Sequence, residues 1–538
     1  MTEAVETTGG PVQGIDHGGV LTFLGIPFAQ APVAELRWAP PQAMPRWSST
    51  FMATAFAPSC PQSEFYYFSN PQVCQGYSRG KCEGYSEDCL SLNIWTPGTS
   101  GSRAVMVWIH GGCFVSGSAS DPQYDGAALA GTQDVVVVSV QYRLGVFGWL
   151  ADDSLRKRDP NGSTGNYGLM DNVAALRWVQ ENIFAFGGDP SRVTIFGESS
   201  GAGSISQLLT VSAAWPYFHR AIMESGTASA WTYMDMQAAA SNFATVTAAA
   251  GCRGGGDVVD CLVWAGADSI VSAVSAVPCR DGCTWAPVID GVYVTGRTMR
   301  LAHQGKIRPN TTVMAGFNRN DGAMFVPCYP TCMASMAGSN LHRYFARRFG
   351  SERVGMLQDI FPPDSTAYAP WLSPDFYAAQ YCETDFSYGC TAQWFSSAVD
   401  AAGGSRAYVY KFTEPTTYDL VLHGDEIGYV FGTIDSPSGR QAKVALITMS
   451  YWAQFARSGD PNVFGLPPWP TWDTGGALMN LNAQAAVEYM PFDTYPGCRF
   501  FRDYWDYYGG CLPHNHLSNM SSMGAATTGD VPTRSVMV

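Results

Sequence analysis

The sequence predicts an α/β fold with a large, mostly parallel central sheet flanked by helices. Three observations lead to this prediction. Continuous apolar, β-branched segments lie at 104–109 and 135–140, a helical apolar pattern covers 169–183, and a short strand at 193–196 runs directly into small residues that open another helix. Strands and helices that alternate in this order are typical of a parallel sheet covered by helices.

The two apolar segments are predicted to be central strands. AVMVWI at 104–109 and VVVVSV at 135–140 are almost free of polar residues. A strand with one solvated face would alternate apolar and polar residues, so both segments are expected to be buried on two faces.

The next elements are a helix and a short strand. The helix is indicated by apolar residues at three- and four-residue spacing, namely Leu169, Val173, Leu176, Val179 and Ile183. Gly187 and Gly188 are expected to end it. VTIF at 193–196 then forms a strand that leads into GESSG at 197–201.

Composition and charge limit the possible partners. The 538 residues carry a net charge of −14, which argues against nucleic acid or an anionic membrane surface as a partner. We find no apolar stretch of about 18 residues, so no integral membrane segment is expected. No linker-like stretch divides the chain. We therefore predict one catalytic domain over residues 1–515 and a polar, flexible tail over 516–538.

The cysteines predict disulfides. The chain holds 15 cysteines, several in close pairs: 74/82, 252/261, 279/283 and 328/332. These spacings do not fit zinc sites, so no metal is expected. Disulfides imply secretion or another oxidising compartment. Because the start MTEAVETTGG lacks the features of a signal peptide, we expect a leader to have been removed.

The segment GESSG contains the candidate nucleophile. It matches the pattern G-x-S-x-G, with Ser199 at its centre, between a predicted strand and a predicted helix. In this context a sharp turn exposes the serine, and glycines at 197 and 201 give the turn room. The alternative, a serine that only caps the helix, does not need both glycines.

A serine nucleophile needs a base, and His423 is the candidate. It lies in LHGDEIGYVFG, after an apolar run and well downstream of Ser199, as the chain order serine, acid, histidine requires. The candidate acid is Asp321, in MAGFNRNDGAMF at the end of a predicted strand. Spacing alone leaves open that Asp321 is a turn aspartate in an Asn-Asp-Gly loop.

Several motifs together resemble one known family. These motifs are SEDCLSLNIWTP (86–97), HGGCFVSG (110–117), NYGLMDNVAALRWVQENIFAFGGDPSRVTIFG (166–197), GESSGAGS (197–204) and HGDEIGYVFG (423–432). They are similar, in order and over most of the chain, to the type B carboxylesterase and lipase family, which includes the cholinesterases. The resemblance implies the α/β-hydrolase fold and an esterase without a cofactor, acting on a small-molecule or lipid ester.

The resemblance also implies roles for individual residues. It assigns Ser199, Asp321 and His423 to the catalytic triad, although most members have glutamate where this chain has Asp321. Around the triad, the residues similar to the family's supporting side chains are Glu198, Ser225 and Glu426. Arg37 with Glu87, and Arg143 with Asp171, match internal ion pairs of the family.

The glycine turn at 110–117 resembles the family's oxyanion hole. The backbone N–H groups of Gly112, Cys113 and Ser200 would stabilise the oxyanion that forms when the ester carbonyl is attacked. Only the amide of residue 113 is needed there, so its side chain is free to vary.

The resemblance implies three disulfides, Cys60–Cys89, Cys252–Cys261 and Cys390–Cys498. We expect 74/82, 279/283 and 328/332 to be local pairs and 382/511 a long-range pair. Cys113 is then left over as an unpaired thiol at the edge of the acyl pocket. Sequence alone does not give connectivity, so these pairings rest on elimination.

The substrate pocket is predicted to be apolar. Trp231 matches the family's acyl-pocket tryptophan, and Met324 and Phe325 follow the acid. Choline esters are disfavoured, because the loop from Cys60 to Cys89 has no tryptophan for a cation–π contact and places Arg79 near the matching position.

The same loop, 60–89, resembles the lid of fungal lipases, but it is rich in polar residues. A polar lid favours an esterase acting on dissolved esters over an interfacially activated lipase. A binding protein without catalysis is the alternative of another class, and it is disfavoured because all three triad residues are present.

Overall fold

The computed structural model describes residues 1–62, 85–253, 256–277, 284–327, 333–363, 372–415, 419–490 and 495–508. The tip of the predicted lid-like loop, the tail at 516–538 and Arg79 lie outside these ranges. So do the cysteines at 74, 82, 279, 283, 328, 332 and 511.

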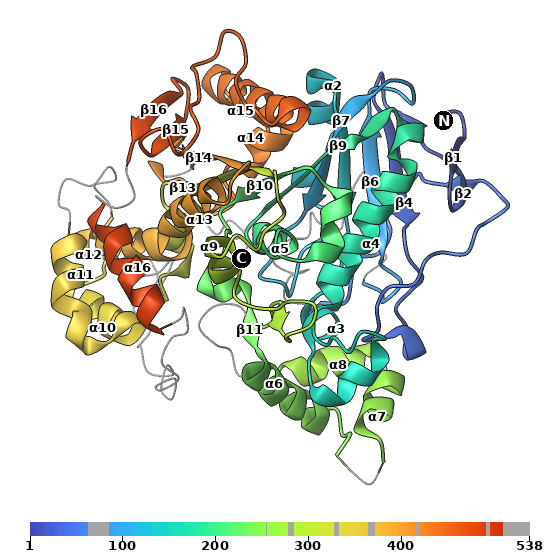
Figure 1. The fold of residues 1–538 in the computed structure, drawn as a ribbon, viewed down its shortest axis with the longest axis horizontal. Helices are drawn as coiled ribbons and strands as arrows, with labels where there is room; N and C mark the ends of the chain where they lie inside the picture. Colours follow the sequence, from blue (N-terminus) through green and yellow to red (C-terminus); the bar gives the residue numbers. More distant parts are fainter. Residues whose placement is uncertain are drawn as a thin grey trace.

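Within these ranges, a twisted sheet of eleven strands runs through the molecule in the order β16-β15-β14-β13-β10-β9-β7-β8-β6-β4-β3 (Figure 1). Its strands are β3 Ile15–Asp16, β4 Leu21–Pro27, β6 Ser91–Thr96, β7 Arg103–Ile109, β8 Val136–Val140, β9 Gly188–Glu198, β10 Arg220–Glu224, β13 Thr312–Asn318, β14 Arg406–Phe412, β15 Ala477–Leu481 and β16 Ala486–Tyr489. Two small sheets are formed by β1 Val5–Thr7, β2 Gly10–Gln13 and β5 Phe51–Met52, and by β11 Met234–Asp235 and β12 Val288–Ile289.

The centre of the sheet is parallel and its margins are antiparallel. Parallel pairs join β8, β7, β9, β10, β13, β14 and β15 in succession. Antiparallel pairs add β6, β4 and β3 on one side and β16 on the other. The predicted fold class, an α/β-hydrolase fold with a mostly parallel sheet, is confirmed.

Helices cover both faces of the sheet (Figure 1). The α-helices are α2 Ala127–Gln133, α3 Gly145–Trp149, α4 Tyr167–Asn182, α5 Ser200–Leu208, α6 Met236–Ala249, α7 Val258–Trp264, α8 Ala267–Val274, α9 Thr298–His303, α10 Gly338–Phe349, α11 Val354–Ile360, α12 Pro374–Thr384, α13 Cys390–Ala401, α14 Ile427–Phe431, α15 Gly439–Ser458 and α16 Pro496–Tyr508. The short helical turns are η1 Ala34–Leu36, η2 Pro122–Tyr124, η3 Asp153–Arg158, η4 Ile183–Phe186, η5 Ser212–Tyr217, η6 Ala230–Thr232, η7 Asp321–Phe325, η8 Ser351–Arg353 and η9 Asp385–Gly389.

The predicted elements are present with small shifts in their boundaries. The segment at 104–109 is β7, and the segment at 135–140 is β8. The predicted helix is α4 followed by η4, and Gly187 ends it with a left-handed backbone (φ 76°).

The core consists of two apolar layers, one on each face of the sheet. Side chains of β7 alternate between them: Val105, Val107 and Ile109 pack in one layer, and Met106 and Trp108 in the other. This alternation follows from the two-residue period of a strand, and it explains why β7 is apolar throughout.

Covalent and ionic links expected from the resemblance are present. The structure contains the disulfides Cys60–Cys89, Cys252–Cys261 and Cys390–Cys498. Arg37 contacts Glu87 through two nitrogens at 2.7 and 2.6 Å. Arg143 contacts Asp171 in the same way, at 2.7 Å for both nitrogens, and this pair is almost fully buried.

The expected pair 382/511 is wrong, because Cys382 is a free, buried thiol in α12. No helix among the described residues is long and apolar enough to cross a membrane.

The register of the parallel strands defines one edge of the sheet. Ile109 of β7 pairs with Gly197 of β9, and Glu198 of β9 pairs with Glu224 of β10. β7, β9 and β10 therefore end within one residue of the same level, and β13 continues for two residues past Gly316, the partner of Glu224. Ligand sites of open α/β sheets lie at this carboxyl edge, and the predicted site residues follow these strands.

Candidate active site

Ser199 lies at the turn between β9 and α5. Its backbone has φ 54° and ψ −125°, a conformation that non-glycine residues rarely adopt. The Ser199 N–H donates to the carbonyl of Glu224 in the neighbouring strand (2.9 Å). Strain held by surrounding hydrogen bonds is a feature of functional turns, and here it exposes the serine above the sheet edge.

The glycines around Ser199 are required by close backbone contacts. A Cβ atom at Gly197 or Gly201 would lie 2.4 or 2.0 Å from the carbonyl oxygen of Ile109. A Cβ atom at Gly226 would lie 2.0 Å from the carbonyl oxygen of Ser199. The two glycines of the predicted pattern therefore let β9 and α5 approach β7, as the sequence analysis expected.

Asp321 and His423 are brought together from two loops. Asp321 opens η7 after β13, and His423 lies between β14 and α14. The distance from His423 Nδ1 to Asp321 Oδ1 is 2.9 Å, and both side chains are buried. Asp321 is thus more than a turn aspartate, since its carboxylate orients the imidazole.

The other ring nitrogen of His423 faces the nucleophile's neighbour. Nε2 lies 3.1 Å from Oε1 of Glu198, but the orientation does not form a hydrogen bond. Among the described residues, no hydrogen bond joins Ser199 Oγ to His423. Such bonds are often long in a free enzyme and tighten when substrate binds.

A hydrogen-bond network surrounds Asp321. Its Oδ2 accepts from the Ser225 hydroxyl (2.9 Å) and from the backbone N–H of Asn318 (2.6 Å). The Ser225 hydroxyl also lies 3.4 Å from Glu426, which accepts a further bond from the side chain of Asn318. Asn318 was not predicted to belong to the site. Its position at the carboxyl end of β13, where ligand sites of such sheets lie, could have indicated it.

The carboxylates beneath Ser199 are strongly perturbed. Burial, with the nearby charges of Asp321 and Glu224, raises the pKa of Glu198 well above its usual range. Burial, with the nearby charges of Glu198, Glu224 and Asp321, raises the pKa of Glu426 well above its usual range. Burial also raises the pKa of Glu224 to about 8, despite a hydrogen bond from Trp452 Nε1 (2.8 Å). Glu224 is a second residue that the sequence analysis missed.

The turn after β7 lies against Ser199 and Glu198. A Cβ atom at Gly111 would lie 2.8 Å from Glu198 Oε2 and 3.0 Å from Ser199 Cβ. The turn has positive φ at Gly112 (109°), Cys113 (51°) and Phe114 (61°). Ser200 begins α5 directly after Ser199, so the three predicted donors lie on the two segments that meet there.

His110, at the start of this turn, is structural. Burial lowers the pKa of its imidazole to about 4, so the ring is neutral. It stacks on Tyr142 at 4.5 Å, and the Tyr142 hydroxyl donates to the His110 carbonyl (2.7 Å).

The expectation that Cys113 is an unpaired thiol is wrong, because Cys113 is disulfide-bonded. The other described cysteines are either paired with one another or, in the case of Cys382, free. A cysteine in this turn thus has a covalent structural role.

Aromatic side chains line the space beside His423. Phe325 and Tyr388 lie 5.1 and 4.9 Å from the imidazole, measured between ring centroids. Trp231 lies 6.0 Å from Tyr388 and 6.4 Å from Phe114. Trp231 and Phe325 both contact Tyr388, and Met324 is part-buried. The role of these three residues as a substrate pocket stays a prediction.

Tyr388 was not predicted. It lies in η9, a π-helical turn between α12 and α13, far from the other site residues in sequence. Such turns occur often at functional sites, but no pattern in DFSYG distinguishes one. Within the described ranges, no group of three or more His, Cys, Asp or Glu side chains is arranged to hold a metal ion.

The chain is similar to known esterases over nearly all of its length. A model of the carboxylesterase family matches residues 1–494. A fumonisin B1 esterase from Sphingopyxis macrogoltabida is 34% identical, over 89% of this chain and 86% of the relative. A cholinesterase from Mus musculus is 32% identical, over 93% of this chain and 86% of the relative.

Solved structures of esterases have the same fold. A carboxylesterase from Geobacillus stearothermophilus superimposes with a TM-score of 0.79 at 31% identity, covering 94% of this chain and all of the other. A protein described as a PNB esterase superimposes with a TM-score of 0.77 at 28% identity, covering 93% of this chain and all of the other.

Proposed function

The chain belongs to the carboxylesterase family and is a carboxylic ester hydrolase, and we propose that it acts through an acyl-enzyme formed on Ser199. The observation that carries this proposal is the 2.9 Å contact between His423 Nδ1 and Asp321 beside the strained turn of Ser199. A serine hydroxyl becomes a nucleophile only when such an oriented base accepts its proton.

The first half of the reaction acylates the enzyme. His423 Nε2 accepts the proton of Ser199 as Oγ attacks the ester carbonyl, and Asp321 stabilises the imidazolium. The N–H groups of Gly112, Cys113 and Ser200 donate to the resulting oxyanion. The intermediate collapses, the alcohol leaves with the proton from His423, and the acyl group stays on Ser199.

The second half repeats these steps with water. His423 removes a proton from water, the hydroxide attacks the acyl-enzyme, and the acid is released as the proton returns to Ser199. A neutral imidazole is needed in both halves, so activity falls as the pH is lowered. No residue in this sequence of steps requires a cofactor.

The acyl group is proposed to be apolar. Phe325 and Tyr388 lie next to His423, and Trp231 contacts Tyr388. An apolar chain gains free energy by displacing water from such aromatic surfaces. We favour dissolved esters over lipid droplets, because the sequence of the loop at 60–89 is polar. Secretion is proposed from the disulfides, which are consistent with an oxidising compartment.

A panel of p-nitrophenyl esters with increasing acyl length tests the function. The wild-type protein is expected to hydrolyse them, with kcat/KM rising beyond acetate, and Ser199→Ala is expected to lose this turnover. A folded wild-type protein that hydrolyses no ester in the panel would favour the binding-protein alternative. A sharp rate increase on a triglyceride emulsion would instead favour the lipase.

A further inference from the structure

We propose that Gln62 is a positioning residue that fixes the oxyanion turn and couples it to the Cys60–Cys89 disulfide. The proposal rests on the proposed function, because it assumes that Gly112, Cys113 and Ser200 donate to the oxyanion. Gln62 lies outside the turn, and the geometry of these donors depends on it.

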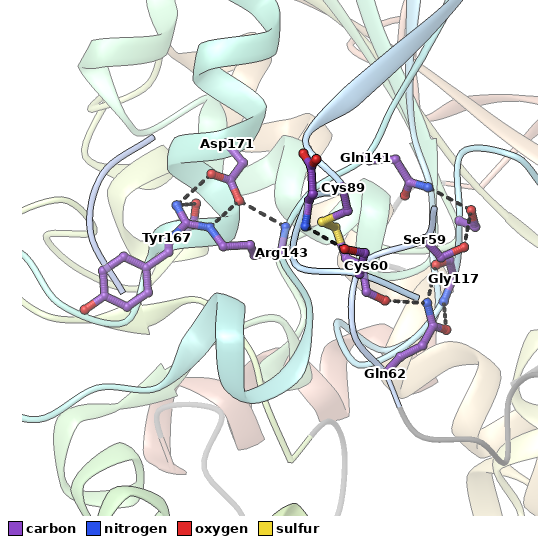
Figure 2. Close-up of a disulfide and its surroundings, with 12 residues drawn as sticks. Ser59, Cys60, Gln62, Cys89, Gly117, Gln141, Arg143, Tyr167 and Asp171 are labelled. Carbon is purple, nitrogen blue, oxygen red and sulfur yellow. Dashed lines mark hydrogen bonds and ion pairs between the residues drawn. A yellow bond between two sulfur atoms is a disulfide. The ribbon is translucent and has the colours of Figure 1, made fainter. Parts of the chain in front are cut away.

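Gln62 holds the end of the turn through a two-way contact. Its Nε2 donates to the Gly117 carbonyl (2.9 Å), and its Oε1 accepts from the Gly117 N–H (3.0 Å), as Figure 2 shows. The same Nε2 lies 3.1 Å from the carbonyl of Cys60. The side chain is only 3% exposed, so water does not compete for these bonds.

Gly117 needs a partner from another part of the chain. Its φ is 109°, and a Cβ atom there would lie 2.4 Å from Nδ1 of His110, so no other residue fits. Its buried N–H and carbonyl have to be paired. Inside the turn, the Gly112 carbonyl already accepts from the N–H groups of Val115 and Ser116, at 3.0 Å each. Gln62 satisfies both polar groups of Gly117 at once.

The opposite end of the turn touches the nucleophile. Gly111 packs against Glu198 and Ser199, with no room for a Cβ atom between them. A turn that rests on Ser199 at one end and on Gln62 at the other has little freedom to shift. Loss of the Gln62 contact therefore lets the donors move relative to Ser199, and such small displacements reduce rates strongly.

The disulfide extends this link into the first loop. Cys60 is bonded to Cys89, and its neighbour Ser59 donates to the hydroxyl of Ser118 (2.9 Å). Gln141 also donates to Ser118 (2.8 Å). Residues on both sides of Cys60 thus hold successive positions of the turn, because Gln62 bonds to Gly117 and Ser59 bonds to Ser118.

The test compares Gln62→Met with a matched control, Gln180→Met. Methionine keeps the length and approximate volume of glutamine but makes no comparable hydrogen bond. Gln180 in α4 likewise donates to two backbone carbonyls, those of Pro190 (2.8 Å) and Tyr217 (3.1 Å). Both variants lose side-chain hydrogen bonds to two backbone carbonyls, and only Gln62→Met loses them at the oxyanion turn.

The readouts separate positioning from stability. We expect Gln62→Met to lower kcat roughly 10-fold with little change in KM, since loss of a whole oxyanion donor costs roughly 100- to 1,000-fold. The inhibition constant of a trifluoromethyl ketone, which adds to the serine as an oxyanion, should rise in parallel. Gln180→Met should keep both values and only lower the unfolding temperature.

Gln62→Glu is the second variant, in case Gln62→Met does not fold. Its carboxylate still accepts from the Gly117 N–H but has no proton for the two carbonyls, so kcat is expected to fall in the same way. A folded variant of Gln62 that keeps the wild-type kcat and inhibition constant overturns the proposal. Failure of the proposed function gives a different pattern, because the wild type would then be inactive or Ser199→Ala would stay active.

Discussion

At the scale of single residues, the site is a group of buried acids arranged around one histidine. Asp321 contacts His423 directly, and Glu198 lies at its other nitrogen. Glu224 and Glu426 complete the group, with pKa values raised by burial. Burial also raises the pKa of Glu198 well above its usual range, so the pKa values of all three glutamates near Asp321 and His423 are shifted in the same direction.

Glu224 makes the stability of the protein depend on pH. Its pKa rises from 4.5 to about 8 on folding, so the folded chain holds this proton more tightly than the unfolded chain. The stabilisation is complete below pH 4.5 and is lost as the pH rises through about 8. Glu224→Gln keeps an acceptor for Trp452 and cannot ionise, so it should unfold at a higher temperature than the wild type at pH 9, and the difference should shrink towards pH 5.

Thermal unfolding across this pH range checks the prediction, with the exposed Glu181→Gln as a control that should follow the wild type. A difference between Glu224→Gln and the wild type that does not change with pH would show that Glu224 ionises normally in the folded chain.

At the scale of elements, two turns border the candidate site. The oxyanion turn after β7 is held by glycine backbone, by Gln62 and by the disulfide of Cys113. The π-helical turn η9 carries Tyr388 to the catalytic imidazole. Both depend on contacts between segments that are distant in sequence.

Cys113→Gly tests the covalent link of the oxyanion turn. The change leaves the partner cysteine without its bond, so the denatured, unreduced chain should contain one more titratable thiol than the wild type. The unfolding free energy should fall by about 2–4 kcal/mol, as for other lost disulfides. Cys382→Ala is the matched control, and it should lower the thiol count by one because Cys382 is free. An unchanged count in Cys113→Gly would contradict the bond.

Tyr388→Ala tests the wall of the acyl pocket. Removing the phenol ring opens space beside Trp231 and Phe325. The variant should therefore favour long acyl esters: kcat/KM for a long acyl ester, divided by kcat/KM for the acetate ester, should rise roughly 10-fold. A change of one methylene or more in an apolar pocket usually has an effect of this size. Tyr377→Ala, a buried change in α12 where the ring meets Tyr381 edge to face, is the control. If Tyr388→Ala and Tyr377→Ala have the same ratio of kcat/KM for the long acyl ester to kcat/KM for acetate, Tyr388 lies outside the pocket.

At the scale of the whole molecule, the sheet assembles the site, and this is why much of it was predictable. The buried strands β7, β8 and β9 were evident from composition, and parallel strands end at one edge. Ser199, Asp321 and His423 each follow such a strand, so their proximity could be expected. The resemblance to one family supplied the roles of the residues and the three disulfides.

The remaining features depend on packing that no local pattern reports. The bond of Cys113 was missed because elimination among 15 cysteines does not determine connectivity. No local pattern marks Gln62 or Tyr388, since Gln62 meets Gly117 and Tyr388 meets His423 only in the folded chain. Glu224 resembles any strand-end acid until its burial is known.

The central claim is that Ser199 is the nucleophile and His423 its base, and covalent labelling tests it most directly. A p-nitrophenyl phosphonate should release one p-nitrophenolate per chain and leave one adduct, which peptide mass spectrometry should place on Ser199. His423→Ala should slow this labelling by several orders of magnitude, because the hydroxyl then keeps its proton. An adduct on another residue, or full-rate labelling in His423→Ala, would contradict the account.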